Sequence, residues 1–236
     1  MKERALVTYV HGDYARRLAG LTHLTLEPYA RRVGADFLVI QDSRYQPNSF
    51  FHLMYGLKFH LYDLLRDYAR ILAVDNDLIV RGDTPDLFSL VPPDHFGAYD
   101  ELADHDHGQL AYVKDYCARA GKAVPAWNGG YFNAGLMVIP QAQRELFACP
   151  EQLVDCPCGE QTYLNVRLRE LGFPYTALPW RYNLMHWLWT LERLEQAYVI
   201  HYSDIHRQGY RRESRIIGDL AAWAAWGLLP EGFDSY

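Results

Sequence analysis

The fold of this chain is decided by the stretch Ile71-Leu72-Ala73-Val74-Asp75-Asn76-Asp77-Leu78-Ile79-Val80. Its first residues are apolar and predict a buried strand, which ends at two carboxylates one residue apart. In open α/β sheets, ligands bind at the carboxyl edge of the strands. Two hard oxygen donors at that edge suit Mg²⁺ or Mn²⁺ bound to a phosphate-bearing substrate. An Asp-X-Asp pair alone is equally typical of a surface turn, so the interpretation depends on the rest of the chain.

The length of 236 residues fits one large α/β domain or two small ones, and the absence of a repeat or a linker in the sequence favours a single domain, residues 1–236. Half of the residues are hydrophobic, 22% are charged and 14% are aromatic, so a sizeable core can form. The net charge of −6 argues against a general nucleic-acid binder. The chain enters its first apolar run directly and has no stretch as long as a membrane span. We therefore expect a cytoplasmic protein with no signal peptide and no membrane span.

Apolar runs alternate with stretches of helical periodicity, which predicts a mainly parallel central sheet flanked by helices. Asp13 is expected to cap a first helix, and Pro28 to begin a second helical piece. Residues 41–52 and 100–130 lack a regular pattern and are expected to be loops. The predicted strands are Ala5–Val10, Phe37–Ile40, Ile71–Val74, Phe96–Tyr99, Ala134–Ile139 and Tyr198–His201, and the later predicted helices are Leu53–Tyr68, Thr84–Leu90, Glu160–Leu171 and Asp219–Leu229.

The cysteines give little support for a metal site. Cys149, Cys156 and Cys158 lie close together in the sequence, so a structural zinc site is conceivable. However, the spacing lacks a paired Cys-X-X-Cys, and Pro157 stiffens the segment. Reduced thiols are the default expectation for a cytosolic protein.

Two further residues can complete a site around the carboxylate pair. His201 ends the last predicted strand, and a neutral imidazole suits the place of a third metal ligand beside two carboxylates. Lys58 lies on the helix that leads into the third strand and can reach a diphosphate held by the metal. Taken singly, a histidine at a strand end is more often a packed or surface residue, and a lysine on a helix more often belongs to a solvated face.

Two motifs bring small and polar residues to turns. Gly129–Ile139 is a turn that enters a strand, and its small residues let another group approach the backbone closely, although a simple β-bulge has the same pattern. Glu160-Gln161 opens a helix, where an acid suits the helix N-terminus and can also lie near a reacting centre.

Taken in order, these motifs resemble glycosyltransferase family 8, the retaining glycosyltransferases that include glycogenin and the bacterial lipopolysaccharide galactosyltransferases. The resemblance spans roughly residues 4 to 204. It implies a GT-A type nucleotide-diphospho-sugar transferase fold and transfer of a hexose, with retention, from a UDP-sugar to a saccharide or glycan acceptor. The matching segments are Thr8–Tyr14, Lys58, Ile71–Val80, Tyr131–Ile139, Glu160–Asn165, Tyr182-Asn183 and His201-Tyr202.

The resemblance also implies roles for individual residues. Asp75, Asp77 and His201 would hold Mn²⁺ (or Mg²⁺) on the donor's diphosphate. Glu160 and Gln161 would face the anomeric carbon as catalytic residues. No carboxylate in the sequence is an evident nucleophile, and Glu160 and Gln161 are equally well placed to act on the sugar. The donor-binding residues would be Thr8, Tyr14, Lys58, Asn76, Asn133 and Ala134.

The chain departs from the family pattern at two places. Glu160 stands where the family usually has aspartate. The lysine–proline–tryptophan run that usually follows the His-Tyr pair is missing, and with it the lysine that grips the diphosphate. Arg207, Arg211 or Arg212 can replace that lysine, because guanidinium also suits phosphate. A solvated loop is an equally good interpretation of this basic segment.

Other protein classes fit parts of the sequence less well. The aspartyl-phosphate phosphatases also have an apolar strand ending in Asp-X-Asp, but their motif usually opens the chain and needs Thr or Val soon after the second Asp. A sugar-nucleotide pyrophosphorylase would have a glycine-rich basic loop where this chain has His11-Gly12-Asp13. A non-catalytic nucleotide-sugar-binding protein that kept the metal site is the strongest alternative, because the lysine run is missing.

Overall fold

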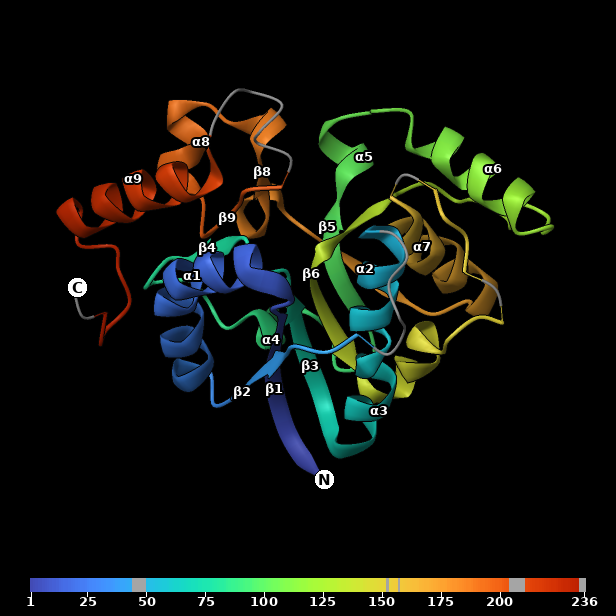
Figure 1. Cartoon of the computed structure of the whole chain (residues 1–236), viewed down its shortest axis with the longest axis horizontal. Helices are drawn as coiled ribbons and strands as arrows, with labels where there is room; N and C mark the ends of the chain where they lie inside the picture. The colour runs from blue at the N-terminus through green and yellow to red at the C-terminus, as the bar shows by residue number, and fades with distance from the viewer. Residues whose placement is uncertain (44–49, 152, 157, 204–210, 234–236) are drawn as a thin grey trace.

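A computed structural model describes residues 1–43, 50–151, 153–156, 158–203 and 211–233. Within them a six-stranded sheet in the order β2-β1-β3-β6-β5-β7 forms the centre of the molecule (Figure 1). The sheet is mixed: β1 is parallel to β2 and β3, and β5 is parallel to β7, whereas β6 is antiparallel to its neighbours β3 and β5. The strands are β1 (Lys2–Tyr9), β2 (Asp36–Ile40), β3 (Tyr68–Val74), β5 (Phe96–Asp100), β6 (Phe132–Pro140) and β7 (Tyr175–Leu178).

Helices cover both faces of this sheet, which explains why its central strands are continuous apolar runs. Helix α1 (Gly12–Arg32) lies on one face, and α2 (Phe50–Lys58), α3 (His60–Asp67) and α7 (Gly159–Leu171) lie on the other (Figure 1). Successive side chains of a strand point to opposite faces. In β1, Val7 and Tyr9 accordingly join the core under α2, α3 and α7, whereas Leu6 joins the core under α1.

A second, smaller sheet brings the C-terminal part of the chain back to the end of β3. It has the order β4 (Leu78–Val80), β9 (Val199–His201), β8 (Leu184–Met185). Strands β4 and β9 are antiparallel, and their register places Leu78 opposite His201. Helix α9 (Arg212–Ala225) packs beside α1, and its Trp223 is buried in the core next to this sheet. The carboxylate pair and the strand-end histidine therefore meet at one edge.

Some sequence predictions of helices were wrong. Helix α1 continues through Pro28 instead of restarting there, because Thr25, Leu26, Tyr29 and Ala30 bury one side of it and packing outweighs the hydrogen bond that proline cannot donate. The predicted helix 53–68 is two helices, α2 and α3, and α2 already begins within the predicted loop 41–52. Tyr68 belongs to β3.

Further differences lie later in the chain. The predicted loop 100–130 contains α5 (Glu101–Asp104), capped by the Asp100 side chain, and α6 (Gln109–Arg119). Asp86, not Thr84, caps α4 (Leu87–Leu90). Helix α9 begins and ends earlier than predicted. Further elements that the sequence did not predict are β4, β7, β8, α8 (Leu191–Gln196), and the 3₁₀ turns η1 (Gln141–Phe147), η2 (Trp180–Tyr182) and η3 (His186–Leu188). Among the described residues, no helix combines the length and the apolar character needed to cross a bilayer.

Candidate functional site

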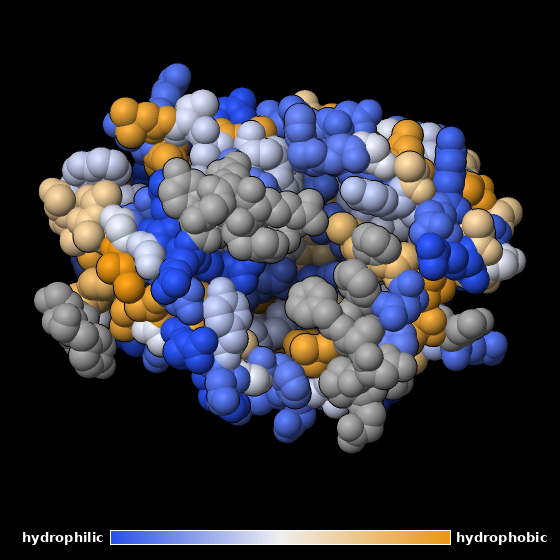
Figure 2. All heavy atoms as spheres, turned by 45° about the horizontal axis from the view of Figure 1, so that its top comes forward, coloured by the Kyte–Doolittle hydropathy of each residue, from blue (hydrophilic) through white to orange (hydrophobic). Residues whose placement is uncertain are grey.

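A cleft of about 630 Å³ opens at the edge where β1, β3, β6 and β9 bring their polar ends together. Figure 2 shows this side of the molecule, hollowed at its middle and with hydrophilic residues gathered beside the hollow. The cleft is polar toward β3 and β9 and apolar toward α2. Its polar lining includes Lys58, Asp75, Asn76, Asp77, Asn133, Glu160, Gln161, His201 and Arg212, and its apolar lining includes Leu53, Met54 and Leu57.

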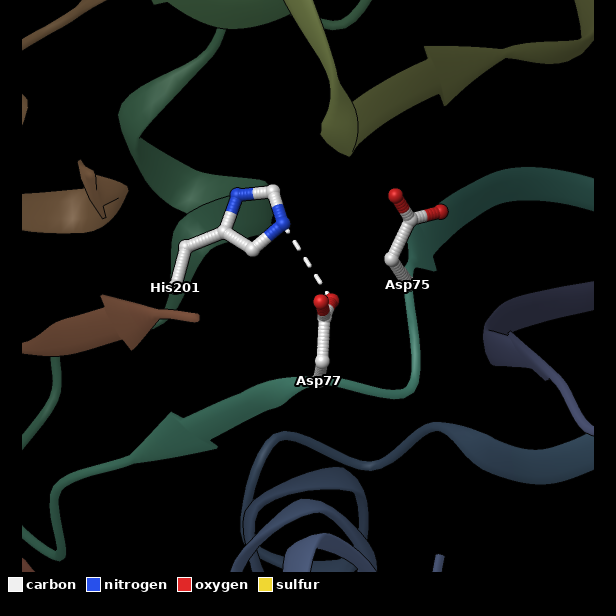
Figure 3. A group of neighbouring side chains, drawn as sticks. All are labelled: Asp75, Asp77 and His201. Carbon is white, nitrogen blue, oxygen red and sulfur yellow. Dashed lines mark ion pairs between the residues drawn. The ribbon is translucent and has the colours of Figure 1, made fainter. Parts of the chain in front are cut away.

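Asp75, Asp77 and His201 form a candidate metal centre in this cleft (Figure 3). One ligand atom from each residue lies within 4.8 Å of the other two. Asp75 continues β3, where its backbone N–H donates to the carbonyl of Gly135 over 2.8 Å, and the backbone carbonyl of Asp77 accepts from Tyr202 over 2.9 Å. The two sheets thus fix the site from both sides. The predicted ligand set is brought together by backbone pairing.

A chain of hydrogen bonds determines which nitrogen of His201 faces the carboxylates. The backbone N–H of Gly135 can only donate, so the side-chain atom of Asn133 that it meets at 2.8 Å is the oxygen. That same oxygen accepts from Nδ2 of Asn183, which leaves Oδ1 of Asn183 to accept from Nδ1 of His201 at 2.9 Å. Nε2 of His201 then points to Asp77, at 3.3 Å from its Oδ1. This orientation is the one a metal-binding imidazole needs.

The donor set fits a divalent cation. Two carboxylates and one imidazole are a ligand set that Mn²⁺ accepts, and carboxylates also suit Mg²⁺. Oδ1 of Asp75 is buried and, apart from its ion pair with Lys58 at 3.3 Å, has no hydrogen-bond partner among the described residues. Burial disfavours the charged form of Asp77, but His201 and Arg212 outweigh it and lower the pKa of this carboxyl to about 2. The carboxyl of Asp77 therefore stays ionised over the whole neutral range.

Gly135 makes room for the histidine. A Cβ atom at this position would lie 2.2 Å from Cε1 of His201 and 2.9 Å from Oδ1 of Asn133. Both distances are shorter than any van der Waals contact, so a side chain here would displace the imidazole. The contact with His201 therefore explains why a small residue, which the sequence pattern indicated, is required at position 135.

Lys58 is a buried cation between two acids. Its side chain is 2% exposed, and its Nζ atom contacts Glu160 directly and lies 3.3 Å from Oδ1 of Asp75. It also donates to the backbone carbonyl of Ala134 over 2.7 Å. Burial alone would lower the pKa of Lys58, but the two carboxylates outweigh it and raise this pKa. The lysine thus remains charged and connects α2, β3, β6 and α7 at the floor of the cleft.

Arg212 is the arginine that the structure places in the cleft. Its Nε atom lies 3.4 Å from Oδ2 of Asp77 and donates to the carbonyl of Tyr202 over 2.9 Å. Its guanidinium also lies 5.9 Å from the ring centre of Tyr14, which lines the same cleft. Arg211 is exposed and does not line the cleft, and Arg207 lies outside the described residues. Of Arg211 and Arg212, the two of these three arginines that the structure describes, Arg212 is therefore the better candidate for the missing lysine's role.

Asn133 and Gln161 are held in place by the protein. Nδ2 of Asn133 donates to Oε1 of Glu101 over 2.8 Å and to Oε1 of Gln161 over 3.2 Å. Oε1 of Gln161 also accepts the backbone N–H of Ala134, and its Nε2 donates to Glu101. The amide oxygen and the amide nitrogen of each side chain make hydrogen bonds within the protein, although Asn133 and Gln161 both line the cleft. Their geometry suits positioning of neighbouring groups, and Glu160 is the freer of the two predicted catalytic residues.

The remaining predicted residues take different places. Thr8 and Ala134 are buried and do not line the cleft, although Ala134 lies directly behind Lys58. Asn76 lines the cleft and ties the carboxylate turn to α1 through a hydrogen bond to the carbonyl of Ala15. Among the described residues, no cysteine belongs to a group of potential metal ligands. Cys158 lines the cleft mouth, and Cys156 is buried.

The sequence pattern did not single out Glu101, and it indicated Tyr9 only as part of the segment Thr8–Tyr14. Glu101 is 5% exposed and accepts hydrogen bonds from Gln109, Asn133 and Gln161. Burial raises the pKa of this carboxyl against the effect of those donors. Its only signal in the sequence is its place just after the predicted strand that ends at Tyr99. Tyr9 ends β1, and its place in an apolar run predicts only an ordinary aromatic residue of the core.

The mixed sheet, with a metal-ligand group at its carboxyl edge, has the arrangement of the GT-A glycosyltransferases. The sequence pattern of glycosyl transferase family 8 matches residues 22–206, and the chain belongs to this family. A search of the curated proteins found no match.

Solved glycosyltransferase structures share the fold at low sequence identity. One is a glycosyltransferase involved in glycosylation of the major capsid of PBCV-1, with 13% identity, a TM-score of 0.56, and coverage of 92% of this chain and 99% of that chain. Another is an active-site mutant of LgtC, with 16% identity, a TM-score of 0.53, and coverage of 92% and 95%. Mouse xyloside xylosyltransferase 1 is similar at 13% identity and a TM-score of 0.50, with coverage of 86% and 98%.

Proposed function

We propose that this family 8 glycosyltransferase moves a hexose from a UDP-sugar to a saccharide or glycan acceptor, with retention of the anomeric configuration and with a divalent cation. The observation that carries the proposal is the group Asp75, Asp77 and His201, whose ligand atoms lie within 4.8 Å of one another inside the cleft. The same cleft holds a buried lysine and an arginine. It therefore offers positive charge for a diphosphate and ionised oxygens for a metal.

The nucleotide end of the donor is expected at the end of β1. His11, Tyr14 and Ala15 line the cleft there, next to Asn76. Nucleotides bind at the carboxyl ends of strands in such folds. Tyr14 is 43% exposed, so its ring is free to lie along a base. The diphosphate would then extend toward Asp77 and Arg212, and the hexose toward Lys58 and Glu160.

Transfer of the hexose breaks its bond to the diphosphate, whose negative charge grows in the transition state. A divalent cation bound by Asp75, Asp77 and His201 would stabilise that charge. Arg212 can add a charge-assisted hydrogen bond to the leaving diphosphate. Glu160 is held by Lys58 on the other side of the cleft, where its carboxylate can stabilise a positive anomeric carbon. Gln161 and Asn133, which are joined by a hydrogen bond, position the residues on this side of the cleft.

The substitution Glu160→Gln tests the catalytic assignment. It should lower the turnover rate at least about tenfold and leave the affinity for UDP nearly unchanged, because Glu160 would act on the sugar and not on the nucleotide. Glu170→Gln, near the other end of α7, is the matched control and should behave as the wild type. An equal loss of UDP affinity and rate in Glu160→Gln would show that the residue binds the nucleotide or supports the fold.

A nucleotide-sugar-binding protein without transfer activity is the second candidate. Its supporting observation is the absence of the lysine run, together with the ion pair that already engages Arg212 with Asp77. Binding of a UDP-sugar without release of UDP over many hours, with and without acceptors, would favour this function. Steady release of UDP would exclude it.

A further inference from the structure

Tyr9 carries a buried hydroxyl that has no hydrogen-bond partner among the described residues. Its side chain is only 5% exposed, yet it lines the cleft beside Lys58, Asp75 and Glu160. A buried hydroxyl without a partner is rare, because it loses its hydrogen bonds to water and gains none in return. Such a group in a binding cleft indicates that a ligand supplies the missing partner.

Five other buried tyrosines have hydroxyls that are paired within the protein. Their hydroxyls bond to backbone carbonyls or to side chains, so the unpaired state of Tyr9 is a local feature of the cleft. The pairs are Tyr29 with the carbonyl of Pro85, Tyr55 with that of Val154, Tyr163 with that of Ala148, Tyr131 with Thr162, and Tyr202 with Asp219.

The surroundings of the hydroxyl select the chemistry of the ligand group. Burial, and after it the negative charges of Asp75 and Glu160, raise the pKa of Tyr9, so the phenol keeps its proton and donates. Asp75 and Glu160 line the cleft beside Tyr9, so a ligand group at this position meets hydrogen-bond acceptors as well as the Tyr9 donor. A neutral hydroxyl fits, because it can accept from Tyr9 and donate to a carboxylate.

The apolar wall beside Tyr9 points to the same part of the ligand. Leu53, Met54 and Leu57 of α2 line the cleft, and Leu53 and Leu57 belong to the same apolar cluster as Tyr9. A sugar ring presents both hydroxyls and apolar C–H faces, and it can use such a wall together with Tyr9. We propose that the Tyr9 hydroxyl donates a hydrogen bond to one hydroxyl of the transferred hexose, and that Tyr9 is a specificity-determining residue for the donor sugar. This inference rests on the proposed function.

The test compares Tyr9→Phe with the wild type by calorimetry in the presence of Mn²⁺, using UDP, a panel of UDP-hexoses and their deoxy analogues. Tyr9→Phe should bind the preferred UDP-hexose about tenfold more weakly and bind UDP alone with unchanged affinity. One deoxy analogue should bind the wild type and Tyr9→Phe equally, because it lacks the partner hydroxyl. The melting temperature should not fall, since the hydroxyl has no partner to lose.

Tyr29→Phe is the matched control. It removes a paired hydroxyl under α1, far from the cleft wall, so it should lower the melting temperature and leave sugar selectivity unchanged. If the wild type binds UDP-hexoses and Tyr9→Phe binds each of them equally well, this inference is wrong and the proposed function stands. Equal weakening for UDP alone would assign Tyr9 to the nucleotide and also overturn it. A wild type that binds no nucleotide sugar would overturn the proposed function itself.

Discussion

Nε2 of His201 lies 3.3 Å from Oδ1 of Asp77, although the two residues are far apart in the sequence. The pairing of β4 with β9 produces this contact, because it places Leu78 opposite His201. The side chain of Asn183 then orients the imidazole through Nδ1. Backbone register and one amide therefore orient His201 toward the candidate metal centre.

Substitution of Asp77 by asparagine should abolish metal-linked nucleotide binding. The variant keeps its size but loses a charged ligand, so its affinity for UDP in the presence of Mn²⁺ should fall to the value measured without metal. Calorimetry measures both affinities. Asp67→Asn, at an exposed position at the end of α3, should leave them unchanged. Unchanged Mn²⁺-linked affinity in Asp77→Asn would remove Asp77 from the metal site.

Loss of Lys58 should destabilise the fold. Lys58→Met would leave Asp75 and Glu160 facing each other without their shared buried cation. Breaking a buried ion pair from one side costs about 3 kcal/mol in the free energy of unfolding, which urea titration can measure. Lys122→Met, which breaks a partly exposed pair with Glu170, should cost less than about 1 kcal/mol. Similar losses in both variants would mean that Lys58 is not a central support of the cleft.

Gly135→Ala should displace His201. The added Cβ atom would meet the imidazole at 2.2 Å, so we expect a loss of roughly 1–3 kcal/mol in stability together with a loss of Mn²⁺-linked UDP binding. Gly218→Ala on α9 meets no atom within 4 Å and should be neutral or slightly stabilising. Normal metal-linked binding in Gly135→Ala would show that the histidine has more freedom than the structure indicates.

Arg212→Ala should weaken binding of UDP by ~1.5–3 kcal/mol, which corresponds to roughly 10- to 150-fold in Kd. The reason is the place of its guanidinium between Asp77 and Tyr14, where a diphosphate would pass. Arg211→Ala is the control, because this neighbour is exposed and outside the cleft. A larger effect of Arg211→Ala than of Arg212→Ala would contradict the assignment.

The stability of the protein should depend on pH through Glu101. Burial raises the pKa of this carboxyl in the folded state above its ordinary value of 4.5. The stability that the wild type gains relative to Glu101→Gln is therefore fully present below the unfolded pKa and is lost as the pH rises through the folded pKa. Urea unfolding of both proteins from about pH 4 to about pH 8 measures the difference. A difference that does not change with pH would show that the hydrogen bonds to Glu101 fully offset its burial.

The parts of the site that follow from strand ends could be predicted from the sequence. Asp75, Asp77 and His201 each follow an apolar run, and the carboxyl ends of such strands meet at one edge. Glu101 and Tyr9 could not be predicted, because their importance depends on burial by side chains from distant elements.

The errors in secondary structure have a similar cause. Pro28 predicts a helix start by its local chemistry, yet packing of α1 against the sheet carries the helix through it. Residues 100–130 have weak periodicity, and a short helix capped by Asp100 forms there because Glu101 finds partners on β6 and α7. Local patterns predict the longer buried strands of this chain but not the short strands β4, β7 and β8, and tertiary contacts decide the helix boundaries.

The most direct test of the proposed function is ¹H NMR of the wild type with a panel of UDP-hexoses, with saccharide acceptors, and with Mn²⁺ or excess chelator. We predict that UDP is released from one UDP-hexose when Mn²⁺ is present, that a new glycoside with the donor's anomeric configuration accumulates, and that both signals disappear with chelator and in Asp77→Asn. Release of UDP that persists without metal, a product of inverted configuration, or no turnover of any nucleotide sugar would contradict the account.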